Sequence, residues 1–100
     1  MIGHVVMWML KEHADGRSRK ENAALLKEKL DALLEVIPEV RSLEVGLNIE
    51  ESAVAFDVVL LTTFDTARDL GTYQTHPAHE DVKAFVARVS DKRAVVDYKR

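Results

Sequence analysis

Residues 3–11 read GHVVMWMLK, and this segment decides how the rest of the chain is arranged. Its six consecutive apolar side chains, at positions 5–10, are too few for a membrane span and show no helical spacing. A short apolar run of this kind predicts a strand that is buried on both faces, as in the centre of a sheet. Residues 54–64, VAFDVVLLTTF, are apolar without alternation at their centre and predict a second such strand.

Two further segments alternate between apolar and polar residues and predict strands with one wet face, at residues 41–49 and 92–99. Between the strands, Ser18 and Glu21 form a capping box before apolar residues at helical spacing, which predicts a helix ending near Pro38. A cap at position 65 or 66 predicts a short helix, and Pro77 predicts the start of another.

The elements follow one another as βαββαβ, which predicts an α+β fold in a single domain over residues 1–100. Right-handed crossovers for the two βαβ units produce a four-stranded antiparallel sheet. In that sheet the two doubly apolar strands are central and the two alternating strands are edges. The burial predicted from the composition of each strand therefore agrees with the position that the topology gives it.

Both helices must cover the same face of this sheet, so the opposite face has no cover within the chain. That face is apolar in either orientation of the first strand: it presents Val5, Met7 and Met9, or else Val6, Trp8 and Leu10. Burying large apolar side chains is worth about 1.5–3 kcal/mol each. The sequence therefore predicts a homodimer that packs sheet against sheet.

Composition limits the other partners. The net charge is −3 and lacks the positive field that attracts phosphate backbones, so nucleic acid is not expected. The chain contains no cysteine, which excludes disulfides, thiolate nucleophiles and Cys-based zinc sites. The N-terminal apolar run lacks a basic start and a cleavage site, so we expect no membrane association and a cytoplasmic location.

Several segments together resemble the stress-responsive dimeric α/β-barrel (Dabb) family. They are IGHVV at residues 2–6, IP at 37–38 followed by SLEVG at 42–46, TF at 63–64, YQTHPAH at 73–79 and VVDY at 95–98. The resemblance implies a ferredoxin-like protomer that pairs through its sheet into a dimeric barrel. Plant polyketide cyclases are similar to this family, and their histidine and tyrosine motif positions correspond to His79, Tyr73 and His4.

The same residues are plausible on chemical grounds. His79 falls in the first turn of a predicted helix, where the helix dipole disfavours imidazolium and leaves a neutral base. The phenol of Tyr73 can donate a hydrogen bond to a carbonyl that is becoming an enolate. We therefore take His79 and Tyr73 as catalytic candidates, together with a half-buried His4, which the resemblance implies. Trp8 and His76 are ligand-binding candidates, with packing and helix capping as their structural alternatives.

The predicted function is binding of a small, largely apolar ligand between sheet and helices, with His/Tyr acid-base chemistry and no cofactor or metal. The apolar centre of the strand at 54–64 adds no polar group to such a pocket and argues against a polyketide cyclase. Two alternatives stay open: a non-catalytic, stress-associated structural oligomer, and a cofactor-independent monooxygenase, against which the HPAH segment argues. Carbonyls around Leu34, Ile37 and Val40 could hold a cation at a helix end.

Overall fold

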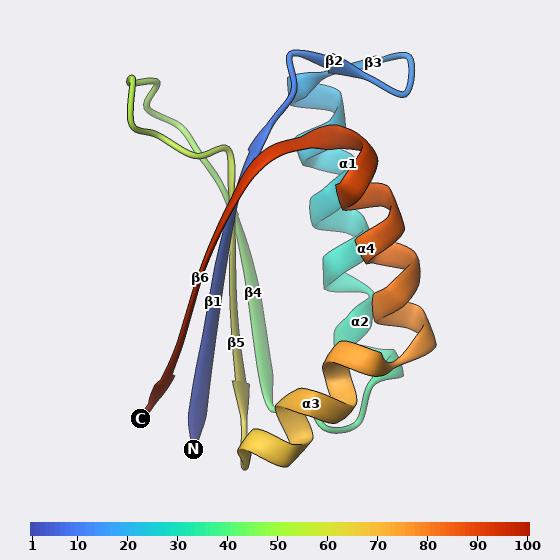
Figure 1. Ribbon diagram of the computed structural model, residues 1–100, viewed down its shortest axis with the longest axis vertical. Helices are drawn as coiled ribbons and strands as arrows, with labels where there is room; N and C mark the ends of the chain where they lie inside the picture. The colour runs from blue at the N-terminus through green and yellow to red at the C-terminus, as the bar shows by residue number, and fades with distance from the viewer.

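Four antiparallel strands form one sheet, and all helices lie on one side of it (Figure 1). The computed structural model describes residues 1–100. In sheet order the strands are β4 (Ser42–Leu47), β5 (Val58–Phe64), β1 (Ile2–Leu10) and β6 (Ser90–Lys99). The helices are α1 (Arg19–Asp31), α2 (Leu33–Val36), α3 (Ala67–Thr75) and α4 (Pro77–Val89). The predicted order, with both doubly apolar strands in the centre, is confirmed.

Side chains cap the starts of α1, α3 and α4. Ser18 and Glu21 form the predicted capping box, with each side chain bonded to the other's backbone N–H at 3.2 and 3.0 Å. The single helix predicted to end near Pro38 is divided at Ala32, which keeps right-handed helical angles. Thr66 caps α3 by accepting from the Asp69 N–H at 3.1 Å. None of these helices is long and apolar enough to cross a membrane.

The strand predicted over residues 54–64 begins later, at Val58. The prediction of strand for residues 54–57 is wrong because Asp57 ends the pairing with β1. The Asp57 carboxylate accepts a hydrogen bond from the Leu10 N–H at 2.7 Å, and the Asp57 N–H donates to the Trp8 carbonyl at 2.8 Å. Residues 48–57 instead form an arm, which leaves the sheet on the side away from the helices (Figure 1). At the arm Val54 is 83% exposed.

A small hairpin precedes α1 and was not anticipated. Its strands are β2 (His13–Ala14) and β3 (Arg17–Ser18), joined by Asp15 and Gly16. Both joining residues have positive φ, 54° and 73°, as a two-residue type I′ turn requires. The Asp-Gly pair is the usual sequence signal for this turn.

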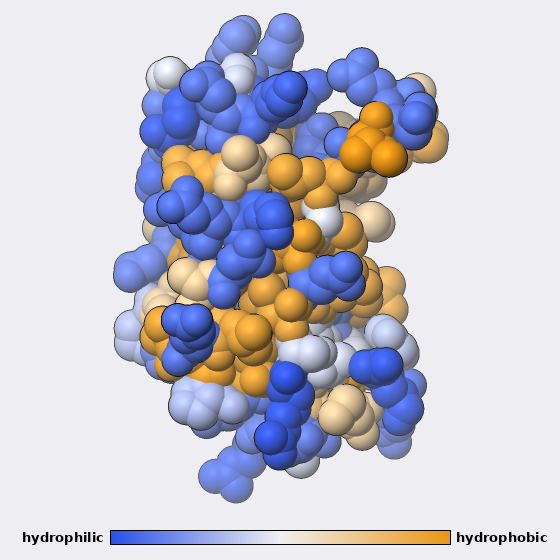
Figure 2. Space-filling view, turned by 180° about the vertical axis from the view of Figure 1, so that it is seen from behind, coloured by the Kyte–Doolittle hydropathy of each residue, from blue (hydrophilic) through white to orange (hydrophobic).

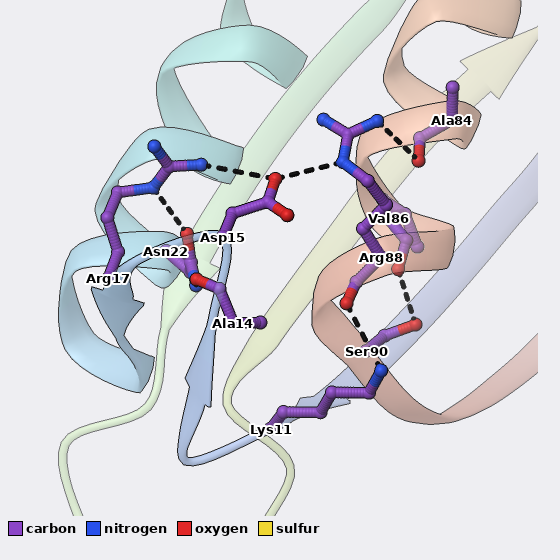
Figure 3. A network of polar contacts seen from close by, with 9 residues as sticks. All are labelled: Lys11, Ala14, Asp15, Arg17, Asn22, Ala84, Val86, Arg88 and Ser90. Atoms are coloured by element: carbon purple, nitrogen blue, oxygen red, sulfur yellow. Dashed lines mark hydrogen bonds and ion pairs between the residues drawn. The ribbon is translucent and has the colours of Figure 1, made fainter.

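Side-chain hydrogen bonds connect the hairpin to both long helices, α1 and α4 (Figure 3). Asp15 accepts from Arg88 of α4 at 2.9 Å and from Arg17 at 3.4 Å. Arg17 also donates at 2.8 Å to the side-chain oxygen of Asn22, which is fully buried on α1. Buried polar side chains are stable only when hydrogen-bonded, so this network ties the hairpin, α1 and α4 together.

The helix-facing side of the sheet, here the inner face, carries the core. Val6, Trp8 and Leu10 point inward and are at most 5% exposed. They pack with apolar residues of α1, α4 and β5, among them Leu26, Leu30, Phe85, Val89 and Leu60. The sequence allowed two orientations of the first strand. In the structure, Val5, Met7 and Met9 are the side chains that point away from the helices.

The opposite, outer face has no cover in the chain and is apolar. Register places Val5 between Leu61 and Val96, and Met7 between Val59 and Ala94. Leu61 is 39% and Val96 61% exposed. Figure 2 shows hydrophobic side chains on this side and at the tip of the arm. Between the arm and the outer face lies a pocket of about 510 Å³.

Replacing Asn22 by alanine is expected to lower the free energy of unfolding by about 1–3 kcal/mol, because two part-buried groups lose their hydrogen bonds to its fully buried amide. Those groups are the Arg17 Nε–H and the Ala14 carbonyl. Urea denaturation followed by circular dichroism measures the change. Glu28→Ala, on the exposed side of α1, is the control and should stay within about 0.5 kcal/mol. Equal losses in the two variants would contradict the assigned role.

Candidate functional site

A cavity of about 550 Å³ lies between the inner face of the sheet and the helices α3 and α4. Its apolar wall is formed by Val6, Trp8, Leu30, Leu60, Val82, Val86 and Ala87. Its polar groups come from His4, Gln74, Thr75, His79, Glu80, Lys83, Ser90 and Arg93. Although eight of the lining residues are polar, most of the surface that faces the cavity is apolar, which is the usual form of a small-molecule site.

His4 reaches the cavity from β1 and is held by the last strand. It is 2% exposed, so the expectation of a half-buried residue was wrong. Antiparallel pairing places Asp97 of β6 directly opposite, and its carboxylate bonds to Nδ1 of His4. A carboxylate accepts, so Nδ1 carries the proton and Nε2 of a neutral His4 is left as the acceptor. The same carboxylate can balance the charge when His4 takes up a proton.

His79 enters the cavity wall from the first turn of α4, as the sequence predicts. Its Nδ1 lies 3.1 Å from the Gln74 carbonyl oxygen. Because a carbonyl only accepts, Nδ1 is the protonated nitrogen and Nε2 is free to accept a proton. Burial lowers the pKa of His79 below its usual value of 6.5, against a smaller opposing effect of the Gln74 hydrogen bond. The ring is therefore a neutral base at neutral pH.

Tyr73 lies behind His79 rather than in the cavity wall. It is fully buried, with ring centroids 4.4 Å from His79, 5.1 Å from Phe64 and 6.2 Å from His4. Burial raises the pKa of Tyr73 to about 12, which keeps the phenol protonated and able to donate. Its hydroxyl has no hydrogen-bond partner. A buried hydroxyl without a partner costs about 1–3 kcal/mol, and because Tyr73 does not line the cavity, its contact with the site is through the ring of His79.

The two ligand-binding candidates have different positions. Trp8 is part of the cavity wall, and its buried indole N–H has no acceptor in the chain. His76 does not line the cavity: its Nδ1 accepts the Ala78 N–H at 3.0 Å and caps α4. The structure therefore gathers His4, Trp8, Tyr73 and His79 around one site and leaves His76 at the helix start.

Asp97 and Arg93 were not predicted as site residues from the sequence. A signal was present, since antiparallel pairing of the first and last strands brings their opposite ends together. Asp97 belongs to the same alternating set as Arg93, and both fall on the inner face.

No group of three His, Asp or Glu side chains converges as a metal site would require. Among the helix-end carbonyls considered as cation ligands, the Ile37 carbonyl accepts a hydrogen bond from the Val40 N–H at 3.2 Å.

The fold and cavity define a ferredoxin-like α+β domain with a ligand-sized site between sheet and helices. The chain matches the model of the stress-responsive A/B barrel domain (Dabb) over residues 2–100, and it belongs to this family. An uncharacterized protein of Streptomyces coelicolor is 35% identical over 81 residues, which cover 80% of each chain. The family resemblance read from the sequence is thereby confirmed.

Solved structures share the architecture. A dimeric ferredoxin-like protein of unknown function from Bacteroides fragilis is 30% identical, with a TM-score of 0.83 over 99% of this chain and 95% of that chain. A dimeric ferredoxin-like protein from Thermobifida fusca is 21% identical, with a TM-score of 0.83 over 99% and 90%. An antibiotic biosynthesis monooxygenase is 10% identical, with a TM-score of 0.72 over 100% and 98%, and shows likeness of fold alone.

The lowered pKa of His79 has a measurable consequence for stability. The unfolded chain binds a proton near pH 6.5, but the folded chain binds it only at lower pH. The contribution of this group to stability is therefore complete above about pH 6.5 and is lost as the pH falls toward the folded pKa. NMR titration should place the His79 midpoint below that of the urea-unfolded chain. A midpoint at or above the unfolded value would contradict the assignment.

Proposed function

We propose that this protein binds a small, largely apolar carbonyl compound in the cavity and moves a proton at the carbon beside its carbonyl group. One observation carries the proposal: two histidines line the same apolar cavity, and each has its Nδ1 held by an acceptor. Both rings are therefore oriented, and both leave Nε2 available for a ligand. Fixed orientation of a base is what general base catalysis requires.

The roles follow from the surroundings of each group. Nε2 of neutral His79 takes the proton from carbon, and the C–H electron pair moves toward the carbonyl oxygen. Tyr73 does not line the cavity, so its buried ring supports His79 by packing against it, and the Nε2–H of protonated His4 donates the hydrogen bond to that oxygen. The pair of His4 and Asp97 is the second proton carrier, because the carboxylate balances an imidazolium.

Exchange of carbon-bound protons tests this chemistry directly. The probe is 4-phenyl-2-butanone in D2O, with loss of the proton signals beside its carbonyl group followed by NMR. His79→Gln should slow the protein-dependent exchange about a hundredfold or more, which is the lower range of general base catalysis. Asp97→Asn should also slow it, because His4 loses its orienting partner. His13→Gln, at an exposed histidine of β2, is the matched control and should leave the rate unchanged.

Exchange that persists in His79→Gln would contradict its role as the base. If the wild-type protein neither exchanges protons nor binds any compound in a ligand screen, the alternative of a structural oligomer stands. In that case substitution of the histidines would alter only thermal stability. Oxygen consumption with a polyphenol would instead support the monooxygenase alternative.

The protein also acts as a homodimer in this proposal, paired through the outer face of the sheet. Two features support the pairing: apolar side chains lie uncovered there, and the 30% identical relative is described as dimeric. Pairing also covers the pocket between the arm and the outer face, which is lined by Met7, Leu47, Ile49, Val54, Phe56 and Val59. A domain of about 100 residues buries only about two-thirds of its unfolded surface, so this additional burial matters.

Replacing Met7 by lysine should disrupt this interface, because the charge would be buried between the two sheets without a partner. Light scattering should give twice the 11.3 kDa chain mass for the wild type and a single chain mass for Met7→Lys. Ala24→Lys introduces the same charge on the exposed side of α1 and should stay dimeric. A monomeric wild type at micromolar concentration would refute the pairing.

A further inference from the structure

Arg93 gives the cavity a second polar end, away from the histidine end. It lies on β6 directly opposite Trp8 of β1, and both residues line the cavity. Side chains of directly paired residues point to the same face, with Cβ atoms about 4.5–5.5 Å apart. The guanidinium of Arg93 and the ring of Trp8 therefore share one region of the wall.

Both groups have unused donors. Arg93 lines the cavity from an exposed position on the edge strand β6, and it makes no ion pair and no side-chain hydrogen bond within the chain. The Trp8 indole N–H is buried without an acceptor. The other charged residues of the wall, Glu80 and Lys83, lie 3.4 Å apart and pair with each other. The unpaired charge of the cavity is thus positive and belongs to Arg93.

The two polar ends are separated by an apolar stretch. His4 and Trp8 are four residues apart on the same strand, which corresponds to about 13 Å at a rise of about 3.3 Å per residue. Val6 lies between them on the inner face, and Leu60 pairs with it from β5. A ligand that spans the cavity must therefore be apolar in its middle.

We infer that the ligand is an amphipathic anion: Arg93, with the Trp8 N–H, binds a carboxylate or phosphate at one end, and an apolar chain carries the carbonyl group to His79. Arginine suits this task because its planar fork donates two parallel hydrogen bonds to either anion. Arg93 is then a residue that determines specificity. This inference rests on the proposed function, because it assigns the substrate class of that site.

Calorimetric binding of four probes with the same chain length tests the inference: decanoate, decyl phosphate, decanol and decylamine. Decanoate or decyl phosphate should bind the wild type at least about tenfold more tightly than decanol, and decylamine most weakly. The stronger of the two anions identifies the natural headgroup. Arg93→Gln should reduce the preference over decanol to less than about threefold, and Arg93→Lys should retain part of it.

Lys92→Gln is the matched control, since Lys92 is the neighbouring cation on β6 and does not line the cavity. It should keep the full preference for the anions. The inference is overturned if neither anion binds the wild type, if decanol or decylamine binds as well as the anions, or if Arg93→Gln keeps the preference.

Proton exchange separates this inference from the proposed function. If proton exchange depends on His79 but the preference for anions does not depend on Arg93, the anion site is overturned and the acid-base chemistry stands. If anion binding depends on Arg93 but the protein shows no proton exchange, the acid-base chemistry is overturned and the anion site stands. The two hypotheses thus fail on different measurements.

Discussion

The pairing of β1 with β5 on one side and β6 on the other is the constraint on which the rest of the structure depends. A strand with two partners has no free edge, and because of the pleat its successive side chains alternate between the two faces of the sheet. In β1 the inner set meets the helices and the outer set stays uncovered. Core, cavity and outer apolar face all follow from this one strand.

The candidate site follows from the register of the same pairings. His4 meets Asp97 only because β1 and β6 are aligned as they are, and Trp8 meets Arg93 for the same reason. A shift of one residue would turn each strand over and move these side chains to the outer face. The chemistry of the cavity therefore depends on backbone hydrogen bonds as much as on the residues themselves.

Prediction from sequence worked where a local signal coincided with burial. The capping box at Ser18, the helix start at Pro77 and the central position of the doubly apolar strands are all present in the structure. Prediction failed where a tertiary hydrogen bond replaced a local preference. Residues 54–57 are apolar enough for a strand, but the Asp57 carboxylate takes the Leu10 N–H and diverts the chain into the arm. The Asp15-Gly16 pair is also a local signal, since it forms the two-residue turn between β2 and β3.

The sequence by itself determined the order of elements, the identity of the central strands and the presence of histidines at a helix start. It did so because these features depend on spacing along the chain, which needs no knowledge of distant contacts. Only the tertiary structure decided which set of β1 side chains faces the helices, that Tyr73 lies behind His79, that Asp97 bonds to His4, and that Arg93 lines the cavity. Residues more than eighty positions apart become neighbours through strand pairing, and the register of that pairing is set by packing of the whole fold.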